Sequence, residues 1–138
     1  MKIDTVKTTW KGGMLLESTN PGGKLLINDG GPSDEIAYGP KALMLSSLAG
    51  CSGLDIASLL TKMRVEVANF DIDVVGEQTE EHPKHYHKVA VTFNFYGKGL
   101  DEKKLQKIVD LSVEKYCGVM AMFRKFAKVT IDIKYHTT

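Results

Sequence analysis

Residues 39–63 read GPKALMLSSLAGCSGLDIASLLTKM, and this stretch decides the fold. Pro40 suits the first turn of a helix, where its missing N–H has no hydrogen bond to lose. Apolar side chains then cover most of the helical wheel, with small serines and glycines between them. A helix that is apolar on nearly every side is usually buried. The pattern therefore predicts a central helix over 42–63 that is buried on most of its faces.

The segments before and after this helix show β and α patterns in turn. Alternating apolar and polar residues predict strands, and a helical period after Asp101, a suitable N-cap, predicts later helices. The expected strands cover 3–10, 14–18, 24–28, 65–77, 86–96 and 129–135, the later helices cover 102–116 and 119–126, and 29–35 is a loop. We expect one domain over 1–138, of the α+β class, with the long helix packed on antiparallel sheet.

The overall composition excludes several classes of partner. Eighteen basic and 17 acidic side chains give a net charge of +1, and the two arginines, Arg64 and Arg124, form no cluster. Nucleic acid is therefore not an expected partner. No apolar stretch is expected to reach the length of a membrane span, and the N-terminus has no apolar signal core. We expect a cytoplasmic protein, in which cysteines are more often free, catalytic or metal-bound than paired in structural disulfides.

Two cysteines, Cys51 and Cys117, are the residues most able to carry chemistry. Sixty-five residues lie between them, so they have no CxxC or zinc-ribbon spacing. The residues alone leave two interpretations open. The thiols are either two unrelated core residues, as free cysteines often are, or a redox pair that the tertiary structure assembles. Cys51 lies inside its helix, so activating it requires a basic or hydrogen-bonding group from elsewhere in the fold.

Other polar residues are weaker candidates. His82, His85 and His87 lie near the start of a strand, where two imidazoles on one face can hold a metal, but solvated side chains at a polar strand end are the favoured interpretation. Asp55 follows Cys51 by four residues and shares its helical face. A carboxylate at that position would disfavour a thiolate. Glu114 is expected at the surface.

The sequence around both cysteines resembles the two signatures of the OsmC/Ohr family, the osmotically inducible and organic hydroperoxide resistance proteins. The first signature is the leucine-rich run after Pro40 that ends in Leu48-Ala49-Gly50-Cys51-Ser52, and the second is Tyr116-Cys117-Gly118-Val119. The resemblance begins at Trp10-Lys11-Gly12-Gly13 and covers nearly the whole chain. The helix end Lys62-Met63-Arg64 and the turn Glu81-His82-Pro83-Lys84 are most similar to the YhfA-like branch.

This resemblance implies a fold and an activity. Members of the family are intertwined homodimers, with antiparallel sheets around a long central helix, in which the paired cysteines lie at the subunit interface. Cys51 would attack an organic hydroperoxide and become a sulfenic acid, and Cys117 would resolve it as a disulfide. A dithiol reductant would restore both thiols. The cycle needs no metal and no organic cofactor. The implied partners are a second copy of the chain, the hydroperoxide and the dithiol.

The sequence departs from the hydroperoxide-resistance pattern at two positions. In that branch a glutamate just after the proline and an arginine from the N-terminal sheet help to hold the first cysteine as a thiolate. Here Lys41 and Ala42 follow the proline, and no arginine precedes Arg64. Lys11 is the basic residue nearest to the expected place of the arginine, so it is our third catalytic candidate. The alternative function is a non-catalytic dimer that binds a small apolar ligand in its interface pocket.

Overall fold

The computed structural model describes residues 1–23, 25–29 and 38–138, without the side chains of 25–29. The chain divides into two compact units, Met1–Met44 and Leu45–Thr138, which are described separately. Most of the loop expected at 29–35, and the first residue of the strand expected at 24–28, lie outside the described residues. The single domain expected over 1–138 stays a prediction.

The N-terminal unit contains an antiparallel meander. Its strands are β1 (Lys7–Trp10), β2 (Leu15–Thr19) and β3 (Leu25–Asp29), in the order β1-β2-β3. Gly12 and Gly13 form the first turn with φ angles of 100° and 56°, which glycine adopts without steric cost. The indole N–H of Trp10 closes this turn by donating to the carbonyl oxygen of Gly13 at 3.0 Å. The three strands expected before the central helix are therefore confirmed, with bounds that move by a few residues.

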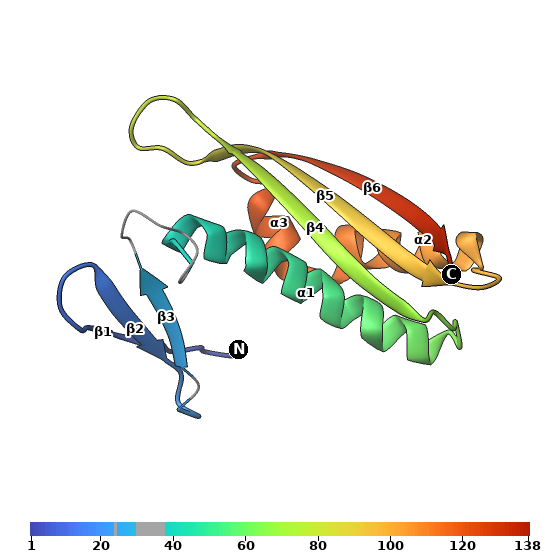
Figure 1. Ribbon diagram of the computed structural model, residues 1–138, viewed down its shortest axis with the longest axis horizontal. Helices are drawn as coiled ribbons and strands as arrows, with labels where there is room; N and C mark the ends of the chain where they lie inside the picture. Colours follow the sequence, from blue (N-terminus) through green and yellow to red (C-terminus); the bar gives the residue numbers. More distant parts are fainter. Residues whose placement is uncertain (24, 30–37) are drawn as a thin grey trace. The chain divides into compact units, whose positions relative to one another are not determined.

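The C-terminal unit contains a second sheet, formed by β4 (Asn69–Gln78), β5 (Tyr86–Gly97) and β6 (Lys128–Thr137) in that order. Strands β4 and β5 form an antiparallel hairpin. Strands β5 and β6 are parallel, with Val91 opposite Ile131. The prediction of purely antiparallel sheet is wrong for this pair. The helices between β5 and β6 bring the chain back to the end of the sheet at which β5 begins. Strand β6 therefore runs in the same direction as β5, as such crossovers require (Figure 1).

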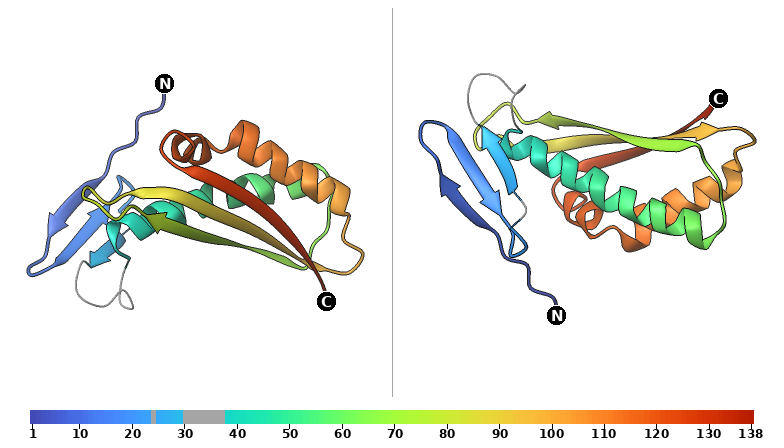
Figure 2. Two further views of the ribbon diagram at one scale, coloured as in Figure 1. Left: turned by 90° about the horizontal axis from the view of Figure 1, so that it is seen from above. Right: turned by 60° about the horizontal axis from the view of Figure 1, so that its bottom comes forward.

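The helices of this unit lie on one face of the β4-β5-β6 sheet (Figures 1 and 2). They are α1 (Pro40–Lys62, which begins in the N-terminal unit), α2 (Glu102–Leu111) and α3 (Gly118–Phe123). The Asp101 side chain caps α2 by accepting the backbone N–H of Lys104 at 3.1 Å. The helix expected over 102–116 is α-helical only to Leu111, because Ser112–Tyr116 form one turn of π-helix.

The core lies between the sheet and these helices. Every second side chain of β5 faces the helices, which is why its apolar residues recur with a period of two. The buried apolar side chains of β5 and the later helices are Val89, Val91, Phe93, Phe95, Leu105, Ile108, Val109, Met120 and Phe123. The outer face of the sheet carries polar side chains, among them Asp71 and Asp73 of β4. This one-sided burial supports the α+β class.

Helix α1 departs from its sequence expectation. Only Leu48, Ser52 and Ile56 are buried in α1, and Leu54 is 76% exposed. The helix packs on the sheet by one face, so the prediction of burial on most faces is wrong for the single chain. The expectation about membrane spans is also wrong for this helix, because its 23 residues include an 18-residue window of mean hydropathy 1.5, enough by length and composition to span a membrane. Core helices of soluble proteins have the same properties.

Candidate functional site

Three polar side chains of the C-terminal unit lie together between α1 and α3. The Sγ atoms of Cys51 and Cys117 and a carboxylate oxygen of Asp55 all lie within 4.8 Å of one another. Both cysteines are free thiols. The fold therefore brings together two residues that the sequence separates by 65, and it adds the acid that lies one turn after Cys51. Of the two open interpretations of the cysteines, the geometry supports an assembled pair.

The local structure explains how the three side chains come together. Cys51 and Asp55 are four residues apart on α1, so they face the same way. Cys117 comes from the other side, at the point where the π-turn ends and α3 begins. Its N–H donates to the carbonyl oxygen of Ser112 at 2.8 Å, which is the closing bond of the π-turn. Its Sγ accepts the N–H of Met120 at 3.3 Å and so caps α3.

Two buried serines hold the site in place. The Ser52 hydroxyl donates to Cys117 Sγ at 3.4 Å, and the Ser112 hydroxyl donates to Asp55 Oδ2 at 3.0 Å. Both serines are fully buried. Each connects α1 to the segment around Cys117. Neither serine was predicted as a site residue from the sequence. A serine directly after Cys51 in an apolar helix was an available signal for Ser52. Ser112 continues the buried row of α2 after Ile108 and Val109, so a serine in that apolar row was a signal as well.

The surroundings distinguish the two thiols. Cys117 is 4% exposed, whereas Cys51 is partly exposed. Burial raises the pKa of the Cys117 thiol, and the neighbouring Cys51 raises it further, while the hydrogen bonds from Ser52 and Met120 act in the opposite direction. Burial is the largest of these effects. Cys117 is therefore a protonated thiol at neutral pH, and Cys51 is the thiol that solvent reaches.

A small cavity adjoins the site. Its volume is about 230 Å³, and it is lined by Asp55, Ser58, Leu59, Lys62 and Tyr116. All five residues belong to the C-terminal unit. The cavity brings solvent to the carboxylate side of the cysteine pair. A small molecule or an ion that enters it arrives beside Asp55.

Lys11, the third catalytic candidate, lies in the N-terminal unit after β1. Its Nζ is 3.9 Å from the Glu17 carboxylate. At this separation on a half-exposed pair, the interaction contributes little to stability. The proposed role of Lys11 beside Cys51 stays a prediction.

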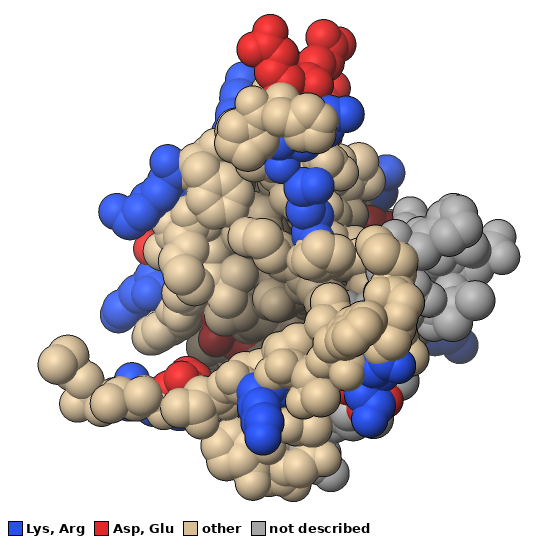
Figure 3. All heavy atoms as spheres, turned by 90° about the vertical axis from the view of Figure 1, so that its left-hand side faces the viewer, with Lys and Arg blue, Asp and Glu red and all other residues tan. Residues whose placement is uncertain are grey.

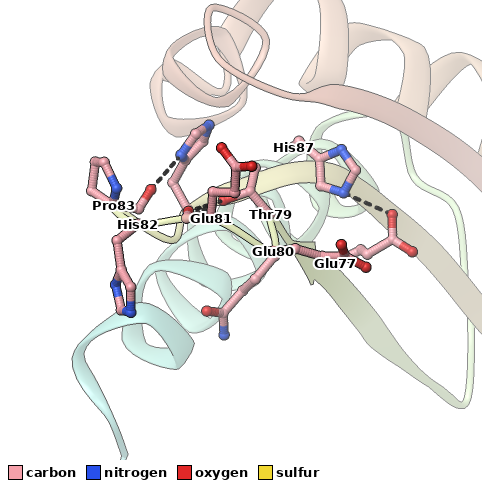
Figure 4. Close-up of a pocket in the computed structure, with 9 residues that line it drawn as sticks. Glu77, Thr79, Glu80, Glu81, His82, Pro83 and His87 are labelled. Atoms are coloured by element: carbon pink, nitrogen blue, oxygen red, sulfur yellow. Dashed lines mark hydrogen bonds and ion pairs between the residues drawn. The ribbon is translucent and has the colours of Figure 1, made fainter.

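The histidines of the β4–β5 hairpin line a different hollow of about 660 Å³, together with Glu77 and Glu81 (Figure 4). His87 Nε2 is 2.9 Å from a Glu77 oxygen, and His85 Nδ1 is 3.0 Å from the carbonyl oxygen of Pro83. Figure 4 shows His82 and His87 on opposite sides of the hollow. In the described part of the chain, these imidazoles are not among the side chains close enough to share a metal ion. The interpretation as a polar strand end stays a prediction.

Charged side chains of both signs are distributed over the surface. Figure 3 shows lysines and arginines separated by uncharged residues on one face, with acidic side chains at one projecting end. Among the residues that the structure describes, the lysines and arginines on this face do not join into one patch. The expectation about nucleic acid itself stays a prediction.

Comparison with known proteins identifies the family. A family model described as OsmC-like protein matches residues 31–132. The chain belongs to the OsmC-like family. The protein YhfA of Escherichia coli K12 is 30% identical to it over 124 residues, which cover 90% of this chain and 92% of YhfA. The resemblance found in the sequence is thus confirmed.

Solved structures of other proteins share the fold. A hypothetical protein from Aquifex aeolicus VF5 is similar with a TM-score of 0.88 and 29% identity, covering 100% of this chain and 99% of that chain. The organic hydroperoxide resistance protein OhrB of Bacillus subtilis is similar with a TM-score of 0.68 and 20% identity, covering 96% and 98% of the two chains. At that identity the second likeness concerns the fold alone.

Proposed function

We propose that this OsmC-like protein is a thiol peroxidase that reduces organic hydroperoxides. The observation that carries the proposal is the approach of two free thiols, Cys51 and Cys117, to within 4.8 Å in one chain. A disulfide requires a sulfur–sulfur distance of about 2.05 Å, so a modest movement of the side chains closes the bond. Family membership adds support, because structurally similar proteins include organic hydroperoxide resistance proteins.

The reaction follows the oxidation chemistry of cysteine. The Cys51 thiolate attacks the terminal peroxide oxygen, the S–O bond forms as the O–O bond breaks, and the alkoxide takes a proton and leaves as an alcohol. Cys51 is then a sulfenic acid. The Cys117 sulfur attacks the Cys51 sulfur, and the sulfenic hydroxyl leaves as water with the proton of the Cys117 thiol. A dithiol reductant then supplies two electrons and two protons and restores both cysteines.

The order of the two cysteines follows from their exposure. Cys51 is partly exposed whereas Cys117 is buried, so a peroxide reaches Cys51 first. Cys117 is buried and protonated, which suits a thiol that reacts only when a sulfenic acid forms beside it. Ser52, which donates to Cys117 Sγ, supports the thiolate that develops on Cys117 as it attacks.

Two further parts of the proposal come from the family resemblance: the protein acts as an intertwined homodimer, and its reductant is a dithiol. We propose the cytoplasm as its location because a reducing compartment suits two free cysteines. Lys11 supplies the positive charge that an arginine supplies in the hydroperoxide-resistance branch, although an ammonium lacks the two-pronged hydrogen bonding of a guanidinium.

A stopped-flow assay tests the proposal. Reduced wild-type protein, Cys51→Ser and Cys117→Ser are mixed with cumene hydroperoxide and a dithiol donor. We expect turnover by the wild type, none by Cys51→Ser, and a single oxidation by Cys117→Ser that ends in a sulfenic or more oxidised Cys51 detectable by mass spectrometry.

Lys11→Ala should slow the oxidation of Cys51, whereas Lys2→Ala, an exposed lysine in the same unit, should not. A wild-type rate no higher than that of Cys51→Ser would refute the peroxidase.

The second candidate function is a non-catalytic dimer that binds a small apolar ligand. The observation that favours it is the sequence Lys41-Ala42 after Pro40, which replaces the glutamate expected of a peroxidase. An inactive wild type that binds a fatty acid in equilibrium dialysis, with Cys51→Ser binding equally well, would support this candidate instead.

A further inference from the structure

The site that holds the two thiols also has the composition of a metal site. Two cysteines and an aspartate converge on one point from two sides, and each offers one ligand atom. We propose that Cys51, Cys117 and Asp55 bind a Zn²⁺ ion in a tetrahedral site whose fourth position is left for water. This inference does not rest on peroxidase activity, although the same thiols would serve both.

The geometry is close to that of a zinc site. Zn–S bonds of about 2.3 Å and Zn–O bonds of about 2.0–2.2 Å place tetrahedral ligand atoms roughly 3.5–3.8 Å apart. The three ligand atoms here are within 4.8 Å of one another, so a contraction of about 1 Å completes the site. Cys51 and Asp55 lie at i and i+4 on α1, a spacing that helical zinc motifs also use. Cys117 provides the third ligand from the start of α3.

The residues around the ligands support this assignment. The Ser112 hydroxyl donates to Asp55 Oδ2, and the Ser52 hydroxyl donates to Cys117 Sγ. Hydrogen bonds of this kind orient ligands in metal sites, and their loss typically lowers metal affinity about 10–100-fold. Both serines are fully buried, so their orientations are fixed by packing. Two of the three ligand atoms are therefore oriented before any metal arrives.

The composition of the cluster favours a cation. A carboxylate and two cysteine sulfurs are ligands that Zn²⁺ accepts, and a bound ion displaces the thiol protons. Asp55 takes part in none of the ion pairs found among the described residues. A divalent cation supplies the opposite charge that those residues do not.

The site is also accessible. Cys51 and Asp55 are both partly exposed, and Asp55 lines the 230 Å³ cavity. Three protein ligands with one open position are typical of zinc sites that accept water or another exchangeable ligand, whereas closed structural sites use four. A bound Zn²⁺ occupies both sulfurs, so the metal-bound protein cannot form the Cys51–Cys117 disulfide.

Metal binding is tested directly, without peroxide. Reduced, chelator-treated full-length protein is titrated with Zn²⁺ against a chromophoric indicator at pH 7.5, and Co²⁺ serves as a spectroscopic probe. We expect one Zn²⁺ per chain and, with Co²⁺, a sulfur-to-metal charge-transfer band and the intense visible bands of a tetrahedral site. Cys51→Ser and Cys117→Ser should each lose at least 100-fold in affinity, and Asp55→Asn at least tenfold.

Matched variants separate this site from other modes of binding. Asp55→Asn keeps an acceptor for Ser112, and its circular dichroism should match that of the wild type. Ser112→Ala should weaken Zn²⁺ binding about tenfold with both thiols intact. Glu114→Gln, an exposed acid near Cys117, and His87→Gln, in the hairpin, should bind as the wild type does. Binding that survives in the cysteine variants, or Asp55→Asn with unchanged affinity, would overturn the assignment. Peroxidase turnover is scored in a separate assay, so each proposal fails alone.

Discussion

The environment of Cys117 gives the two thiols different chemistry at the scale of single residues. Its side chain is 4% exposed, and its sulfur accepts hydrogen bonds from Ser52 and from the Met120 N–H. Burial dominates, so the pKa of the Cys117 thiol lies above its ordinary value of about 8.5. Cys51 lacks this shielding because it is partly exposed. Reagents should therefore reach Cys51 first and Cys117 only after a local opening or after ionisation.

The Cys51→Ser variant isolates the titration of Cys117. The pKa of Cys117 is raised in the folded state, so the protonated thiol stabilises the fold at any pH below the pKa of an unfolded thiol. This contribution is lost as the pH rises through the pKa of Cys117 in the folded protein. We expect slow alkylation of Cys117 by iodoacetamide, with a midpoint above pH 8.5, and a free energy of unfolding that falls above that pH. Alkylation rates and urea denaturation between pH 7 and 10 measure both effects.

A double variant, Cys51→Ser with Cys117→Ser, serves as the control for this titration. In this variant the free energy of unfolding should no longer fall because of the thiol. Any change with pH that remains comes from other groups. An alkylation midpoint below the ordinary thiol value would show that the hydrogen bonds to Cys117 outweigh its burial. Cys117 would then be the more reactive thiol, and the order of the two cysteines would be reversed.

The sequence led to some of the site residues and not to others, for physical reasons. Cys51 and Cys117 were found because their neighbours resemble a family signature, since their spacing alone does not bring them together. Asp55 was placed beside Cys51 by helical periodicity. Ser112 was missed, because the period of α2 shows that this residue faces inward but does not show which side chain of another helix it meets. Contacts between distant elements leave no local pattern.

At the scale of elements, the second sheet was predicted in its strands but not in its pairing. Periodicity of two marked β4, β5 and β6, and their observed bounds lie within a few residues of the expectation. The parallel pairing of β5 with β6 depends on where the crossover returns the chain, which no strand sequence encodes. The outer face of this sheet also carries a polar cluster that joins all three strands, centred on Asn94.

Asn94 should be essential to the stability of this sheet. Its Nδ2 donates to Asp71 Oδ1 at 2.8 Å and to Asp73 Oδ2 at 3.0 Å, and its Oδ1 is 3.0 Å from His136 Nε2. Asn94 is 6% exposed, so the lost partners are not fully replaced by water. Asn94→Asp removes both donors and adds a third carboxylate. We expect it to lower the free energy of unfolding by about 1–3 kcal/mol at pH 7, measured by urea denaturation.

Asn94→Ala separates the loss of donors from the added charge. It should cost less than Asn94→Asp at pH 7, and the difference should shrink as acid protonates the carboxylates. Equal losses for the two variants at every pH would mean that repulsion among the carboxylates contributes nothing. The contribution of Asn94 to the free energy of unfolding would then come from its packing alone.

At the scale of the whole molecule, α1 is more apolar than its burial in a single chain explains. Leu54 is 76% exposed near the middle of this helix, and Gly50, one turn earlier, has no atom within 4 Å of an added Cβ. An open apolar helix face with small residues suits close packing against a second copy. Such an interface is isologous, so each substitution appears in it twice. The face of α1 therefore supports the proposed homodimer.

Leu54→Glu tests this dimer. Burying a leucine contributes about 1.5–3 kcal/mol, and the loss counts twice across a two-fold interface, before any cost of the buried charge. We expect the wild type to have twice the 15.2 kDa chain mass by light scattering, and Leu54→Glu to dissociate with a dimer Kd at least 100-fold weaker. Val75→Glu changes a residue of similar exposure on the outer face of the sheet and should leave the mass unchanged. A wild type of single-chain mass at micromolar concentration, or a Leu54→Glu variant that remains dimeric, would exclude α1 as the interface.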